Sequence, residues 1–189
     1  MVYEVKELGY KDLPNLTSKQ LAEHHDILYK GYVKKLNEIN EKLANLNHGS
    51  GNGTFGDYRE LKIEGSFAYN AVRLHELYFE NMGGTGAPSK DMMSKLDESF
   101  MSFQDFEEEL MDAGLSARGW VVLGLDEDGQ LRLHLCDAHN MNGIWGSKPI
   151  LVMDVYEHAY FIDFGTNRKE YIDGFIKNIE WDVVEKRLS

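Results

Sequence analysis

The sequence predicts an α+β fold in which a long antiparallel helical hairpin is followed by an α/β domain, with a three-stranded antiparallel sheet flanked by helices. Three observations support this prediction. Apolar residues recur at helical spacing over two long stretches, strand-like apolar runs appear only after residue 118, and the glycine-rich segment 83–89 separates the two patterns. We therefore expect an N-terminal helical hairpin domain over residues 1–84 and a C-terminal α/β domain over residues 85–189.

The first half contains two predicted helices. Thr17 and Ser18 are residue types that cap helix N-termini, so a helix is expected over residues 19–47. The glycine-rich stretch 48–57 is predicted to be a loop, and a second helix is expected over residues 58–81. Two long helices joined by a short loop form an antiparallel hairpin.

The second half begins with helical patterns and then changes to strands. Ser102 is expected to cap the second of two short helices, and the segment 126–129 is expected to form a hairpin turn. In the second predicted strand, over residues 131–136, leucines alternate with other residues. Leu135 should therefore face the core and Cys136 should face away from it. The predicted elements are helices over 89–101 and 103–114, strands over 119–125, 131–136 and 149–154, and a helical region over 168–187.

Composition excludes several classes of partner. The formal net charge of −12 argues against nucleic acid and against anionic membrane surfaces, because both attract basic faces. No apolar run approaches membrane-spanning length. Cys136 is the single cysteine, so we expect no intrachain disulfide and a reducing compartment. The charged first residues contain no apolar signal-peptide core, and a cytoplasmic location is therefore expected.

An acidic residue closes the third predicted strand. The apolar run 150–153 is followed by Asp154, and Glu157 and His158 come within four residues of it. An isolated buried charge is very costly. Asp154 therefore marks either the exit of the strand into solvent or the neighbourhood of a cation.

Two histidines lie on the predicted inner faces of the helical hairpin, His24 on the first helix and His75 on the second. Neither helix has an evident inward-facing carboxylate that could pair with them. With Asp154 and His158, three imidazoles and one carboxylate would converge. That set suits iron or manganese, whereas structural zinc sites favour thiolates. From spacing alone, core histidines with other partners remain an equal alternative.

The remaining histidines have weaker claims. His25 follows His24 and points about 100° away on a helix, so it is expected at the surface or at an interface. His48 should be solvated in the glycine-rich loop, and His134 should have a structural place on the polar side of its strand. His139, in the loop after that strand, remains open.

Over residues 13–184 the chain resembles the iron/manganese superoxide dismutase family. The segment DVYEHAYF is similar to the family signature Asp-x-Trp-Glu-His-Ala-(Tyr/Phe)-(Tyr/Phe). Other similar segments occur in the family's order and spacing: the helix from His24 to Asn37, RLHELYFENM, KLDESFMSFQDFEEEL, Gly119-Trp120 and KEYIDGFIKNIEWDVVEKR.

The resemblance implies an antioxidant oxidoreductase that converts superoxide to dioxygen and hydrogen peroxide. It implies one iron or manganese ion per chain, bound by His24, His75, Asp154 and His158 between the two domains. Sequence does not choose between the two metals; His139 gives a weak preference for iron or mixed use. The alternative is a metal-binding dimer of the same fold whose redox activity is lost or altered.

The resemblance also implies roles around the metal. Tyr32 falls at the mouth of the family's substrate funnel, and Arg168 falls at its funnel arginine. Glu157 falls where a glutamate reaches across a homodimer interface to the partner subunit's His158. The family keeps a polar donor beside the bound solvent. Ala71 cannot donate, so this role is assigned to His139.

Three positions depart from the family pattern. Tyr156 replaces the signature tryptophan beside the metal. Leu28 and Phe161 occupy places where the family often has a histidine and a tyrosine that meet across the subunit interface. Because both are apolar here, we expect a dry contact near the dimer interface instead of a hydrogen bond. The sequence leaves dimer and tetramer open.

Overall fold

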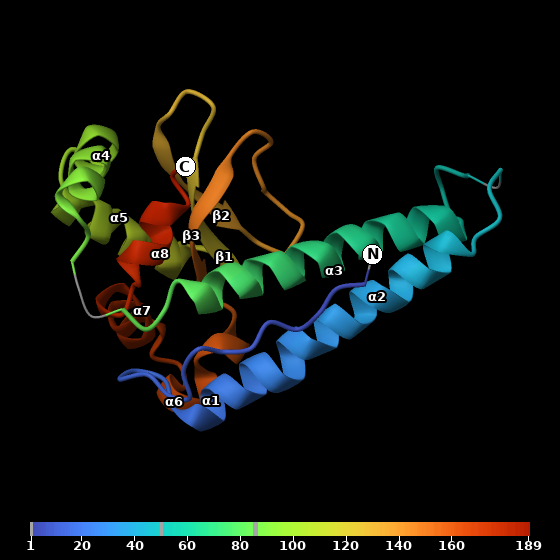
Figure 1. Cartoon of the computed structure of the whole chain (residues 1–189), viewed down its shortest axis with the longest axis horizontal. Coiled ribbons are helices and arrows are strands. Elements are labelled where there is room, and N and C mark those ends of the chain that lie inside the picture. The colour runs from blue at the N-terminus through green and yellow to red at the C-terminus, as the bar shows by residue number, and fades with distance from the viewer. Residues whose placement is uncertain (1, 50, 85–86) are drawn as a thin grey trace.

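The structure is a computed structural model, and it describes residues 2–49, 51–84 and 87–189. It confirms the predicted fold class. A long helical hairpin extends from a second unit in which helices flank a three-stranded antiparallel sheet (Figure 1). The predicted domain boundary between residues 84 and 85 falls at the edge of a gap, because residues 85 and 86 lie outside the described part of the chain.

The first arm of the hairpin is one continuous helical run with a widened section. It consists of α1 (Ser18–Ala22), the π-helical η1 (Glu23–Tyr29) and α2 (Lys30–Ala44). Thr17 caps it as predicted, its side chain accepting from the Gln20 amide. Within η1 the hydrogen bonds reach back five residues, as from the Lys30 amide to the His25 carbonyl. Such widened turns are frequent at functional sites.

The second arm is α3 (Asp57–Glu80), which lies beside α2 over most of its length (Figure 1). Further helices and strands make up the rest of the chain: α4 (Lys90–Phe100), α5 (Phe103–Ser116), β1 (Trp120–Leu125), β2 (Leu131–Cys136), β3 (Lys148–Asp154), η2 (Glu157–Ala159), α6 (Phe161–Phe164), α7 (Arg168–Lys177) and α8 (Trp181–Lys186). Ser102 caps α5, as predicted. The helical region expected at the end is two helices, and the short η2 and α6 were not predicted.

The sheet has the order β2-β1-β3, so β1 is central. The register places Trp120 at the start of β1 opposite Cys136 on one side and Asp154 on the other. α3 packs against β3, and α5 packs against β1 and α7. The middle of the molecule is therefore a continuous apolar core between the sheet and these helices.

The predicted alternation of β2 is wrong at its end. Leu135 is 38% exposed and Cys136 is buried. The reason is that different neighbours cover the two ends of this edge strand. α4 covers the leucine side only near Leu131, whose amide bonds Ser99, whereas Cys136 lies against α3 and the following loop.

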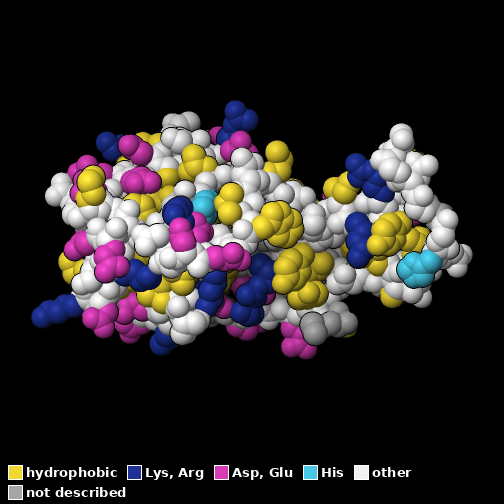
Figure 2. All heavy atoms as spheres, turned by 90° about the horizontal axis from the view of Figure 1, so that it is seen from above, with side chains coloured by type: hydrophobic (Ala, Val, Ile, Leu, Met, Phe, Trp, Pro, Cys, Tyr) yellow, Lys and Arg dark blue, Asp and Glu magenta, His cyan; other side chains and the backbone are white. Residues whose placement is uncertain are grey.

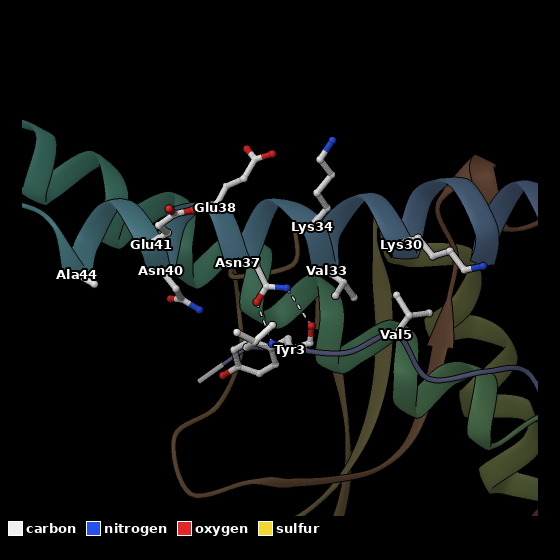
Figure 3. Close-up of a pocket in the computed structure, with 11 residues that line it drawn as sticks. Tyr3, Val5, Lys30, Val33, Lys34, Asn37, Glu38, Asn40, Glu41 and Ala44 are labelled. Carbon is white, nitrogen blue, oxygen red and sulfur yellow. Dashed lines mark hydrogen bonds between the residues drawn. The ribbon is translucent and has the colours of Figure 1, made fainter.

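The N-terminal segment lies along the helical hairpin and is held by side chains of α2 and η1. Figure 3 shows the Asn37 side chain hydrogen-bonded to the backbone of Tyr3. Its Oδ1 accepts from the Tyr3 amide at 2.8 Å, and its Nδ2 donates to the Tyr3 carbonyl at 2.9 Å. Further along, the Lys6 amide donates to the Tyr29 hydroxyl, and the Lys6 carbonyl lies 2.8 Å from His25 Nε2. His25 was expected at the surface or at an interface, but it is buried within the single chain, because this segment covers it.

Helix α3 also carries a buried carboxylate, Glu76. Glu76 accepts from the Tyr29 hydroxyl at 3.2 Å, pairs with Arg73, and lies 3.6 Å from Lys6 Nζ. None of these contacts is to His24 or His75. The partners of Glu76 come from η1, from its own helix and from the N-terminal segment, so it serves to fix that segment.

In the described part of the chain, no helix has both the length and the apolar character needed to cross a membrane. Figure 2 shows acidic and basic side chains interspersed over one face of the molecule, without a continuous basic area there.

Asn81, at the end of α3, completes the hydrogen bonding of the outer strand β3. Its Oδ1 accepts from the Val152 amide at 2.9 Å and its Nδ2 donates to the Val152 carbonyl at 3.1 Å. Arg187 donates to the same Oδ1 at 3.3 Å. A single buried amide thus links α3, β3 and the C-terminal end of the chain.

Replacing Asn81 by alanine would leave the buried amide and carbonyl of Val152 without partners. Each such group costs about 1–3 kcal/mol, so we expect the free energy of unfolding of the metal-free protein to fall by about 2–6 kcal/mol. Asn45→Ala is the control, since exposed Asn45 bonds only the Glu41 carbonyl and should change stability by less than about 0.5 kcal/mol. Urea titration measures both. Equal stabilities for the two variants would show that the bonds from Asn81 to Val152 do not stabilise the fold.

Candidate metal centre

Four side chains from four elements converge beneath the hairpin. His24 comes from η1, His75 from α3, Asp154 from the end of β3 and His158 from η2. Each offers one ligand atom, and these atoms all lie within 4.8 Å of one another. Asp154 Oδ2 is at the middle, 3.1 Å from His24 Nε2, 3.7 Å from His75 Nε2 and 3.2 Å from His158 Nε2.

The carboxylate is fixed by its own strand and by α7. Its second oxygen, Oδ1, accepts from the Tyr156 amide at 2.9 Å. Its backbone carbonyl accepts from the Tyr171 hydroxyl at 2.6 Å, and that hydroxyl also lies 3.0 Å from the Tyr78 hydroxyl. Only Oδ2 is thereby left to face the three imidazoles.

The imidazoles of His24 and His75 present unsatisfied nitrogen atoms to that oxygen. His75 Nδ1 donates to the Ala71 carbonyl at 2.7 Å, so in the neutral ring Nε2 carries a lone pair. Within the described residues, the buried Nε2 atoms of His24 and His75 have no hydrogen-bond partner. Buried polar atoms are normally paired, and lone pairs facing a carboxylate repel it. A cation among these atoms satisfies all of them, so the residues fit a metal ion.

The protonation states agree with this reading. Burial lowers the pKa of His24 and of His75, so both rings are neutral and can ligate. Burial by itself raises the pKa of Asp154, but the imidazoles of His158 and His24 outweigh it and hold that pKa well below its usual range. Burial also opposes protonation of His158, but the charge of Asp154 raises its pKa. A set of imidazoles and one carboxylate is typical of iron and manganese sites.

A hydrogen-bonded chain of three aromatic residues lies beside the centre. Trp120 Nε1 donates to His139 Nδ1 at 3.0 Å, and His139 Nε2 lies 3.0 Å from the Tyr32 hydroxyl. Burial lowers the pKa of His139 to about 4, so the ring is neutral. Because Nδ1 accepts from the indole, the single ring proton is on Nε2 and is donated to Tyr32.

Tyr156, Glu157, His158 and Arg168 line one hollow at the surface of the single chain. The Tyr156 ring stacks on the His158 ring, with centroids 5.1 Å apart and planes 18° apart. Arg168 donates from Nε to the Tyr160 hydroxyl and from a terminal nitrogen to the Ala117 carbonyl, so its guanidinium is held in place. Glu157 is exposed in the single chain.

Leu28 and Phe161 are the two apolar residues at positions where the family pattern has polar ones. Leu28 is partly buried in η1, and Phe161 at the start of α6 is 48% exposed. Ile27 and Ile162, their sequence neighbours, are exposed as well.

Three residues that support the site were not singled out from sequence. Trp120 fixes the proton position on His139, Tyr171 holds the Asp154 backbone, and Gln20 bonds the His158 carbonyl. Each acts across a large sequence separation, and no local spacing signals it. For Trp120, its place at the start of a buried strand was the available clue, because a buried indole N–H needs an acceptor.

Comparison with known proteins agrees with the geometry. Residues 88–187 match the family described as iron/manganese superoxide dismutases, C-terminal domain. An iron superoxide dismutase of Aquifex aeolicus is 43% identical over 185 residues, which cover 95% of this chain and 87% of the relative. A manganese superoxide dismutase of Haloarcula marismortui is 35% identical over 174 residues, 89% of this chain and 83% of the relative. The chain belongs to the iron/manganese superoxide dismutase family.

Proposed function

We propose that this protein is a superoxide dismutase that converts superoxide to dioxygen and hydrogen peroxide at one iron or manganese ion. His24, His75, Asp154 and His158 would hold the ion. The observation that carries the proposal is the buried Asp154 carboxylate, which faces two imidazole nitrogens that have no other partner among the described residues. When bound, the ion supplies a one-electron redox couple that can both oxidise and reduce superoxide.

His139 and Tyr32 are proposed to deliver protons to the reaction. The neutral His139 ring donates to the Tyr32 oxygen, which leaves the hydrogen of the Tyr32 hydroxyl available for another acceptor. Burial raises the pKa of Tyr32, so the hydroxyl keeps its proton at neutral pH. Each group can donate and accept in turn, which is the property a proton path requires.

Tyr156 and Arg168 are proposed to shape the approach to the ion. Tyr156 covers one side of the centre by stacking on His158, and burial raises its pKa to about 12, so it stays neutral. Arg168 supplies a fixed positive charge at the hollow, in a protein whose net charge of −12 repels anions. Local positive potential of this kind attracts a small anionic substrate.

Glu157, Leu28 and Phe161 are proposed to make contacts across the interface of a homodimer. Glu157 is exposed beside a ligand histidine and is free to accept a hydrogen bond from the partner subunit's His158, which would orient that ring. Leu28 and Phe161 would meet across the same interface in a dry contact, and the exposure of Phe161 in the single chain supports this. Pairing of two such dimers into a tetramer is compatible with this arrangement.

We also propose that the chain divides at residues 84 and 85 into a helical hairpin domain and an α/β domain. The first would supply His24 and His75, and the second Asp154 and His158. A cytoplasmic location is supported by the single cysteine. The relatives named for iron and for manganese leave both metals as candidates, and His139 weakly favours iron or mixed use.

Replacing His75 by alanine tests the proposed function. The variant should lose bound iron or manganese and the consumption of superoxide together, because the ion would lose a ligand fixed by the Ala71 carbonyl. His48→Ala is the control, since His48 is exposed in the loop of the hairpin and should change neither quantity. Metal analysis and a superoxide-consumption assay measure the outcome. Full activity in His75→Ala would exclude the proposed centre.

Replacing His139 should separate catalysis from metal binding. In His139→Ala the ion should remain bound while turnover falls about 10- to 100-fold, because Tyr32 loses its donor and the Trp120 N–H loses its acceptor. His139→Gln should restore much of the rate, since one amide offers both an acceptor and a donor. Unchanged turnover in the alanine variant would remove His139 from the proton path.

The Leu28–Phe161 contact can be tested with a double-mutant cycle. Leu28→His and Phe161→Tyr, made singly, each place a polar group in a dry contact and should weaken the dimer by about 1–3 kcal/mol. The double variant should recover part of that loss, because the two groups can bond to each other across the interface. Analytical ultracentrifugation measures the dissociation constants. Strictly additive losses would show that the two side chains do not meet.

A further inference from the structure

We propose that Gln20 is a positioning residue that sets the place of the ligand His158 relative to the ligand His24. This inference rests on the proposed metal centre and adds to it a residue outside the four ligands. Gln20 lies on α1, four residues before His24, and therefore on the same side of that helical run. It joins the run to the segment that carries His158.

The contact is made through both ends of one buried amide. Gln20 is 1% exposed. Its Nε2 donates to the His158 carbonyl at 2.6 Å, and its Oε1 accepts from the Ile162 amide at 3.0 Å. A primary amide has a donor and an acceptor at a fixed separation, so it holds both backbone groups at once. Gln20 thus spans η2 and the start of α6.

His158 is the ligand that most needs such a contact. Its side chain is 26% exposed, whereas the other three ligand side chains are almost completely buried. His75 is fixed through its ring and Asp154 through its carboxylate and its carbonyl. His158 lies in a three-residue helix followed by one of four residues, and such short helices are unstable without tertiary contacts. Its backbone position therefore depends on the side chain that bonds it.

An exposed contact nearby provides an internal comparison. The Thr17 amide and hydroxyl both donate to the Asp163 carboxylate at 2.7 Å, which also docks the start of α1 onto α6. This second contact joins the same two elements but does not bond to a ligand residue. If docking of the elements were all that mattered, losing either contact would have the same effect at the metal. If Gln20 positions His158, only its loss changes the metal environment.

The test compares Gln20→Met with Asp163→Ala in the full-length protein, using manganese(II) as the probe. Methionine keeps the length and volume of glutamine but makes neither backbone bond. We expect Gln20→Met to bind manganese about 10- to 100-fold more weakly and to change its paramagnetic resonance spectrum. Asp163→Ala should keep the wild-type affinity within about twofold and the wild-type spectrum, although both variants lower the stability of the metal-free protein.

Wild-type affinity and spectrum in Gln20→Met would overturn the inference, as would equal changes in Asp163→Ala. Gln20→Asn provides a second variant if the methionine protein does not fold. It keeps the amide but is one methylene too short to hold both backbone groups, so it should shift affinity and spectrum in the same direction. Failure of the wild type to bind iron or manganese would instead refute the proposed centre itself, which separates the two outcomes.

Discussion

Asp154 is a completely buried carboxylate whose Oδ2 lies within 3.7 Å of three imidazole nitrogens, and the rest of the structure is arranged around it. Its charge must be balanced, because an unpaired buried charge is very costly. His158 can balance part of it, since the charge of Asp154 raises the pKa of that ring, but His24 and His75 do not, because burial lowers the pKa of both. A bound metal ion resolves the conflict, because it neutralises the carboxylate and accepts the lone pairs of neutral rings.

The fold holds this centre from outside through a small number of long-range bonds. Tyr171 bonds the Asp154 carbonyl, Gln20 bonds the His158 carbonyl, and the hydrogen-bonded chain of Trp120, His139 and Tyr32 lies beside His75. These contacts connect segments far apart in sequence, so the ligand geometry is a property of the whole chain. Metal binding should therefore stabilise the folded state.

Sequence patterns predicted the long helices and the three strands, because apolar periodicity is a local signal. For the four converging residues, spacing alone left core histidines as an equal alternative, and it was the resemblance to the family that implied a shared metal ion. The patterns failed where burial is decided by distant segments. His25 was expected at the surface or at an interface, but the N-terminal segment covers it. Leu135 was expected to be buried and Cys136 to be exposed, but the reverse is found, because α4 and the loop after β2 cover opposite ends of β2. The partners of Gln20 are also beyond local patterns, since they lie more than a hundred residues away.

The most direct test of the account is superoxide consumption by the wild-type protein as a function of bound metal. Metal-free protein would be loaded stepwise with iron or manganese, and the rate would be compared with the measured metal content. The account predicts no activity without metal and a rate proportional to bound iron or manganese up to one ion per chain. One ion bound per chain without superoxide consumption, or consumption that does not depend on the metal, would contradict it.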